Sequence, residues 1–222
     1  MNRLAIILAA IVVGSVQPVC SVYSQRKTTA DVLEKHMAGG NLQEETVEGA
    51  FISCLGRARL PGGIVRVLGC EDRLTPGKVA LPEGTVRDGL EAIVHISPSY
   101  RWQAGDGVVN LLPTREQPAL LDVRIALLRV DKAPSVRSAV ATLVALPEVR
   151  SALVRLELVE GVRILHGPIS LEPEPPFSVD CRNVTVRGAL NEIVRREGRA
   201  VWEYKEAHCD GKNEFWISVV AE

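Results

Sequence analysis

Apolar side chains recur in four stretches of the chain with the spacing of an amphipathic helix. Each stretch starts with a threonine or a serine, and apolar residues follow at positions i, i+4, i+7 and i+8. A hydroxyl at the start accepts a hydrogen bond from a free backbone N–H of the first turn, and the spacing gathers the apolar side chains on one side of the helix. The pattern therefore predicts four helices, which begin directly after Thr46, Thr85, Ser135 and Thr185.

These four stretches are related to one another. The sequence of residues 85–93 (TVRDGLEAI) recurs at residues 185–193 (TVRGALNEI), and a tryptophan follows each copy at the same distance, as Trp102 and Trp202. The other two stretches are more divergent copies. A repeated segment of this kind indicates one structural unit used several times, so we expect four related units in the chain.

Short strands are predicted around these helices. They are expected at residues 63–68, 78–81, 100–103, 108–112, 162–165, 177–180, 200–205 and 214–220. The turn residues Asp106-Gly107 and Asp210-Gly211 join two pairs of them into hairpins. A further helical stretch is expected at 148–156, in the third unit. The sequence thus predicts an α+β fold of repeated βαβ and βαββ units, with short sheets packed on amphipathic helices, in two lobes.

The first residues have the pattern of an export signal. Arg3 precedes an apolar run from Leu4 to Gly14, which is too short to span a bilayer. Small residues allow cleavage after Ser21 or after Ser24. Lipidation at Cys20 is the alternative, although the residues before it, Gln17-Pro18-Val19, fit poorly with the sequence that precedes a lipidated cysteine. We therefore expect a protein that is soluble after cleavage, does not span a membrane, and is located in the periplasm or secreted.

A proline-rich stretch divides the rest of the chain. Its sequence is PTREQP, and it lies between the second and third units. Segments of this composition are typical of linkers between folded parts. We predict a signal peptide over residues 1–24, a first lobe over 25–113, a linker over 114–118 and a second lobe over 119–222.

The first lobe resembles a known family. It contains a helix of the type T-x-x-x-A-F, then V-x-L-P-E-G-T-V-R-D-G-L-E-A-I and W-x-x-x-x-G-V-V-N-L. In these motifs residues 42–113 are similar to the short N-terminal domain shared by outer-membrane secretins and TonB-dependent receptors, and residues 122–220 resemble a more divergent second copy. The resemblance implies a small α+β fold and contacts with other proteins in the periplasm. The family domain usually precedes a secretin ring or a receptor barrel, and we expect neither within this chain.

Cysteine positions suggest disulfide bonds. Cys54, Cys70, Cys181 and Cys209 remain after the predicted cleavage. An even number in an exported protein favours disulfides, and four cysteines allow three pairings. The local pairing, Cys54 with Cys70 and Cys181 with Cys209, keeps each bond within one lobe. Alternatively Cys54, on the apolar side of its helix, is a buried thiol.

Composition and motifs argue against several functions. The formal net charge of -1 and the aromatic content of 4% disfavour nucleic-acid binding. The chain has no H-E-x-x-H or G-x-S-x-G motif and no glycine-rich phosphate loop, so we expect neither catalysis nor a cofactor. The sequence His208-Cys209-Asp210 offers metal ligands, but a site would need more of them, whereas a disulfide explains the cysteine by itself.

We therefore predict a non-catalytic interaction module that binds another protein of the cell envelope. Phe215 and Trp216 are neighbours on a predicted strand and must face opposite sides, and the alternation places Trp216 outward, where it is an interface candidate. Arg87, Arg137 and Arg187 occupy the same place in three units. They either meet carboxylates of a partner or cover apolar surface with their stems.

Two alternative functions remain open at this point. One is a structural subunit of a larger secretion or transport assembly in the envelope. The other is a small protein that depends on a metal or on disulfides and is built around His208 and the cysteines.

Overall fold

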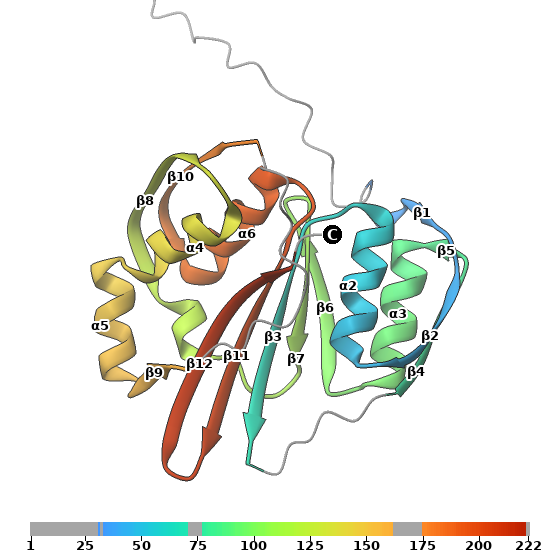
Figure 1. The fold of residues 1–222 in the computed structure, drawn as a ribbon. Coiled ribbons are helices and arrows are strands. Elements are labelled where there is room, and N and C mark those ends of the chain that lie inside the picture. Colours follow the sequence, from blue (N-terminus) through green and yellow to red (C-terminus); the bar gives the residue numbers. More distant parts are fainter. Residues whose placement is uncertain (1–30, 32, 71–76, 162–174, 221–222) are drawn as a thin grey trace, which may run out of the picture.

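The computed structural model describes residue 31 and residues 33–70, 77–161 and 175–220. The predicted signal peptide and the predicted strand at 162–165 lie outside the described residues. The fold of the described part is α+β, as the sequence predicts, and it has two lobes (Figure 1). No helix in these ranges is both long and apolar enough to cross a bilayer.

A six-stranded sheet runs through the described part of both lobes. Its strands lie in the order β6, β7, β3, β11, β12 and β9. Their bounds are Tyr100–Gly105, Val108–Pro113, Gly62–Gly69, Val201–Cys209, Lys212–Val220 and Leu158–Glu160. The first three strands belong to the first lobe and the last three to the second. The lobes meet where β11 pairs in parallel with the whole of β3, from Gly62 opposite Val201 to Gly69 opposite His208.

Helices cover opposite faces of this sheet in the two lobes. The first lobe contributes α2 (Val47–Ala58) and α3 (Val86–Ile96), and the second contributes α4 (Val136–Val144) and α6 (Val186–Glu197). Ile64 on β3 belongs to the core beneath α2 and α3, whereas its neighbour Val65 belongs to the core beneath α4 and α6. Successive side chains of a strand point to opposite faces, so β3 contributes to both cores.

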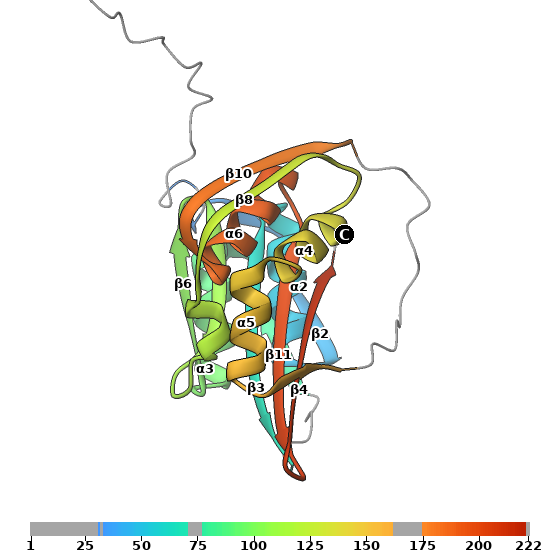
Figure 2. The same ribbon diagram turned by 90° about the vertical axis from the view of Figure 1, so that its left-hand side faces the viewer.

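Smaller strand pairs lie outside the helices. In the first lobe β1 (His36–Met37) pairs with β5 (Gly84–Thr85), and β2 (Gly40–Glu45) pairs with β4 (Gly77–Leu81). In the second lobe the long strands β8 (Arg124–Ala133) and β10 (Phe177–Thr185) pair with each other and arch over α4 and α6 (Figure 2). A short 3-10 helix (Ala119–Asp122) precedes β8, and α5 (Pro147–Arg155) follows α4.

The helix starts follow the chemistry that the sequence predicts. The side-chain oxygens of the four cap residues accept hydrogen bonds from backbone N–H groups three residues later, at 3.1 to 3.2 Å. At Thr85 the Asp88 carboxylate also accepts from the Thr85 backbone N–H, which completes a capping box. These contacts satisfy donors that the helix itself leaves free.

The second lobe repeats the first but is turned over. Strands β6, β7 and β3 correspond to β11, β12 and β9, and they lie in the same order along the sheet. Strand β11 runs parallel to β3 and β7, however, whereas its counterpart β6 runs antiparallel to β7. The strands of the second lobe thus keep the order of the first lobe but run in the opposite direction. This corresponds to a half-turn about an axis in the plane of the sheet, which places the helices of the second lobe on the other face. The lobes therefore share one sheet and are not independent units.

Candidate strand-docking edge

Strand β6 ends the sheet in the first lobe. It pairs with β7 on one side, and no other strand of the described ranges pairs with it. The side chains of Tyr100, Trp102 and Ala104 pack against the core beneath α2 and α3, while those of Arg101 and Gln103 are exposed on the other face. A strand of six residues with one side unpaired presents free backbone donors and acceptors to a further strand.

The register shows which peptide groups point to the open side of β6. The Thr114 N–H donates to the Ser99 oxygen at 2.8 Å, and residues of an antiparallel pair alternate between bonded and non-bonded positions. Residues 101, 103 and 105 therefore bond to β7, and the backbone groups of Trp102 and Ala104 point to the open edge.

The Trp102 side chain is half-buried at this edge. Its indole N–H donates to Glu91 Oε1 on α3 at 3.2 Å. The guanidinium carbon of Arg87 lies 5.9 Å from the centre of the Trp102 ring, and Arg87 also pairs with Glu34 at 3.2 Å. An arginine at this distance from an indole makes a cation–π contact. The indole is thus held by α3 and partly covered by a charged side chain.

Beneath β6, a buried polar cluster fixes the start of the strand. The Tyr100 hydroxyl donates to Glu48 Oε1 at 3.0 Å, and the same oxygen lies 2.9 Å from Arg66 Nε. Glu48 and Arg66 are both 7% exposed. Burial is the main cause that raises the pKa of Tyr100 above its ordinary value, and the neighbouring Glu48 adds to it. The hydroxyl therefore stays protonated and can keep donating.

In the second lobe β11 carries the counterpart of this site, and its edge is occupied by β3. Trp202 on β11 donates its indole N–H to Asn191 Oδ1 on α6 at 2.8 Å, which matches the bond of Trp102 to Glu91. Trp202 is fully buried because β3 lies beside it, with Gly63 as its register partner. The Gly62 N–H donates to the Ala200 oxygen at 3.1 Å across this junction. The edge that β11 presents to β3 is the counterpart of the open edge of β6.

The three arginines predicted as interface candidates lie on α3, α4 and α6 and have different neighbours. Arg187 pairs with Asp122 at 2.8 Å, and Arg87 is engaged with Glu34 and Trp102 as described above. Arg137 makes no ion pair with the described residues and borders a groove of about 350 Å³ between α4, α5 and β12. Because α3 lies on the opposite face of the sheet from α4 and α6, Arg87 is separated by the sheet from Arg137 and Arg187. Their role as interface residues stays a prediction.

The alternation predicted for Phe215 and Trp216 is confirmed. Phe215 is 1% exposed and belongs to the core of the second lobe. Trp216 lies on the opposite face and is half-buried, with its indole so close to Gly161 that a β-carbon there would lie 2.2 Å from the ring. Its role as an interface residue stays a prediction.

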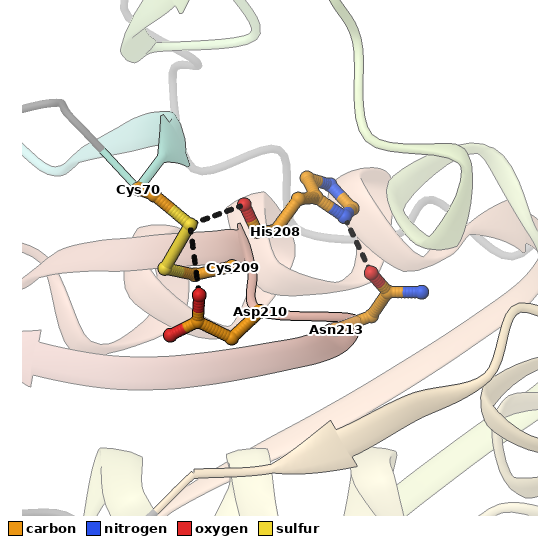
Figure 3. Close-up of a disulfide and its surroundings, with 5 residues drawn as sticks. All are labelled: Cys70, His208, Cys209, Asp210 and Asn213. Carbon is orange, nitrogen blue, oxygen red and sulfur yellow. Dashed lines mark hydrogen bonds between the residues drawn. A yellow bond between two sulfur atoms is a disulfide. The ribbon is translucent and has the colours of Figure 1, made fainter.

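The predicted disulfide pairing is wrong. The disulfide joins Cys70, directly after β3, to Cys209 at the end of β11 (Figure 3). The parallel pairing of β3 with β11 brings these ends together, whereas Cys54 and Cys181 are free thiols buried in α2 and β10. Burial raises the pKa of Cys54 to about 12 and that of Cys181 to about 11. The alternative that Cys54 is a buried thiol is confirmed.

His208 lies outside the group of described residues that has the spacing of metal ligands. Its Nδ1 lies 2.9 Å from Asn213 Oδ1, and its Nε2 lies 2.9 Å from Glu206 Oε1. Within the described ranges, the group with the spacing of metal ligands is Cys70, Cys209 and Asp210. Both sulfur atoms of that group are in the disulfide, so neither is available as a thiolate, the form that binds metals.

Comparison of the chain with protein-family models, with curated proteins and with solved structures finds no match. The resemblance to the short N-terminal domain of secretins and TonB-dependent receptors therefore stays a prediction. The repeat seen in the sequence already pointed to Trp102. The sequence did not indicate that β3 covers Trp202, whereas Trp102 lies at an open edge.

Proposed function

We propose that the protein is an exported, non-catalytic interaction module of the cell envelope, and that it binds an extended segment of another envelope protein at the open edge of β6. One observation carries this proposal: β6 is the counterpart of β11, and the corresponding edge of β11 is filled by β3 in a regular parallel pairing. Addition of a strand to an exposed sheet edge is a common mode of peptide recognition.

The surface disulfide supports the exported location. Cys70 is exposed, and disulfides at exposed positions persist in oxidising compartments such as the periplasm. The apolar run near the N-terminus and the resemblance to secretin and TonB-receptor domains favour the same compartment. We therefore place the partner in the envelope as well.

The chemistry of the described side chains favours binding over catalysis. A nucleophilic cysteine needs a lowered pKa, and the pKa values of both free thiols are raised. Both ring nitrogens of His208 are engaged by neighbouring side chains. The groove beside Arg137 is lined mainly by aliphatic side chains of α4 and β12, and Glu160 is the one acidic side chain in its lining.

Photocrosslinking in intact cells tests the proposal. A benzoylphenylalanine at the exposed position Gln103 is expected to capture a partner protein, and one at the exposed position Thr142 on α4 is not. Ala104→Pro should abolish the capture, because its N–H points to the open edge and proline removes that donor without loss of a bond to β7. Ala104→Ser keeps the donor and should keep the capture. Equal capture by the proline and serine variants, or none at Gln103, would refute the proposal.

A further inference from the structure

We propose that the segment bound at β6 runs parallel to this strand and carries a glycine opposite Trp102, followed two residues later by a large aliphatic side chain. This inference rests on the proposed function, since it describes the chemistry of the partner at the same edge. The junction between β3 and β11 serves as the template.

The template applies because the two tryptophans are held in the same way. Each indole N–H donates to the residue at the same place in the preceding helix, Glu91 for Trp102 and Asn191 for Trp202. The backbone register of the two hairpins is also the same, with each tryptophan at an edge-directed position. The indole of Trp102 therefore occupies the space, relative to its edge, that the indole of Trp202 occupies beside β3.

The indole of Trp202 leaves no room for a side chain on the residue opposite it, Gly63. A β-carbon at Gly63 would lie 2.1 Å from Cε2 of Trp202 and 2.2 Å from Cζ2, far inside van der Waals contact. Both atoms belong to a rigid ring, and in each lobe the preceding helix holds this ring through its indole N–H. A strand beside Trp202 needs a glycine at this place, and we infer the same requirement for a strand beside Trp102.

The residue two positions after the glycine lies on the same face of the sheet, and its neighbour differs between the two edges. Val65 lies opposite Tyr204 in the template and is fully buried. The counterpart of Tyr204 on β6 is Ala104, which leaves more room at the open edge. A strand bound there gains most from a large aliphatic residue two positions after its glycine, because this side chain can bury its surface beside Ala104. The pattern in the template is Gly63-Ile64-Val65.

A peptide with the sequence of β3 (GGIVRVLG, residues 62–69) is the probe for this inference. Fluorescence polarisation of the labelled peptide with the full mature protein is expected to show saturable binding. A peptide with Gly63→Val should bind at least about tenfold more weakly, while a peptide with Ile64→Val, whose changed side chain lies on the other face, should bind like the parent. Ala104→Pro in the protein should abolish binding, and Ala104→Ser should not.

A second protein variant separates the steric requirement from other effects. Trp102→Ala removes the ring, so the Gly63→Val peptide should then bind as well as the parent peptide. A spin label at the N-terminus of the bound peptide should broaden the amide signal of Arg101 more than that of Gly105, as a parallel strand requires. Absence of binding, equal binding of the Gly63→Val peptide to the unaltered protein, or the opposite broadening pattern would overturn the inference. If capture at Gln103 in cells persists in that case, the proposed function stands and only the glycine requirement or the strand direction fails.

Discussion

Gly63 of β3 lies directly opposite Trp202 of β11, and the indole fills the space that a side chain at residue 63 would need. This contact lies at the junction of the two lobes. The Asn110 side-chain oxygen is also close, 2.5 Å from the place of the missing β-carbon. The absence of a side chain at one position thus allows the lobes to form a continuous sheet.

Gly63→Val is therefore expected to destabilise the whole protein. The added side chain must displace a buried indole and a buried amide, and overpacking of this kind costs about 3 kcal/mol in the free energy of unfolding. Urea denaturation followed by far-UV circular dichroism measures the change. Gly105→Ala is the matched control, because a β-carbon at Gly105 meets no atom within 4 Å. A Gly63→Val variant as stable as the control would contradict this account of the junction.

Loss of the disulfide should also weaken the junction. Cys70 and Cys209 are separated by 139 residues in sequence, and a crosslink that closes so long a loop contributes about 4–5 kcal/mol in the chain-entropy model. The double variant Cys70→Ser/Cys209→Ser should lower the denaturation midpoint accordingly. Non-reducing peptide mapping of the unaltered protein should recover the Cys70–Cys209 pair. Recovery of a bond between Cys54 and Cys70 would show that the pairing described here is wrong.

The two free thiols should be protected from alkylation in the folded protein. Burial raises the pKa of Cys54 to about 12 and that of Cys181 to about 11, so both are protonated and shielded at pH 8. Iodoacetamide with mass spectrometry should modify neither residue until urea is added. Because these pKa values are higher in the folded state than the ordinary value of 9.0, the thiols favour folding below about pH 9, and that contribution is lost as the pH rises toward 12. Rapid modification in buffer would refute the buried placement.

Removal of one member of the pair formed by Glu48 and Arg66 should be costly. Both side chains are buried, and a buried charge without its partner destabilises a protein by about 3–5 kcal/mol. Glu48→Gln is expected to lower the free energy of unfolding by about that amount in thermal or urea denaturation. Asp180→Asn breaks the exposed pair with Arg129 and should have a much smaller effect. Similar losses in both variants would argue against a special role for the buried pair.

The elements that the sequence predicts are those whose signals are local. Thr85 and Asp88 form a capping box within one helical turn, and Asp106-Gly107 forms the turn of the first hairpin, with φ angles of 51° and 78°. Strand β8 gave no such signal, because Leu127 is exposed and the alternation along the strand is irregular. Its partner β10 lies far away in sequence, so the pairing depends on the folded chain.

The candidate site was likewise predictable only in its local parts. The repetition of Trp102 as Trp202 was visible in the sequence, and so was the turn beside each of them. The covering of Trp202 by Gly63 was not, because it arises where the two lobes meet. The disulfide was missed for the same reason: the neighbours of Cys70 and Cys209 are set by the pairing of β3 with β11 and not by distance along the chain.

The bond between Cys70 and Cys209 joins the ends of β3 and β11 across 139 residues of sequence. A chain made from its N-terminus completes β3 long before β11 exists. β3 can pair with β7 as soon as the first lobe is made, but its other side stays open until residues 201–209 follow. Covalent closure of the sheet therefore comes last in synthesis.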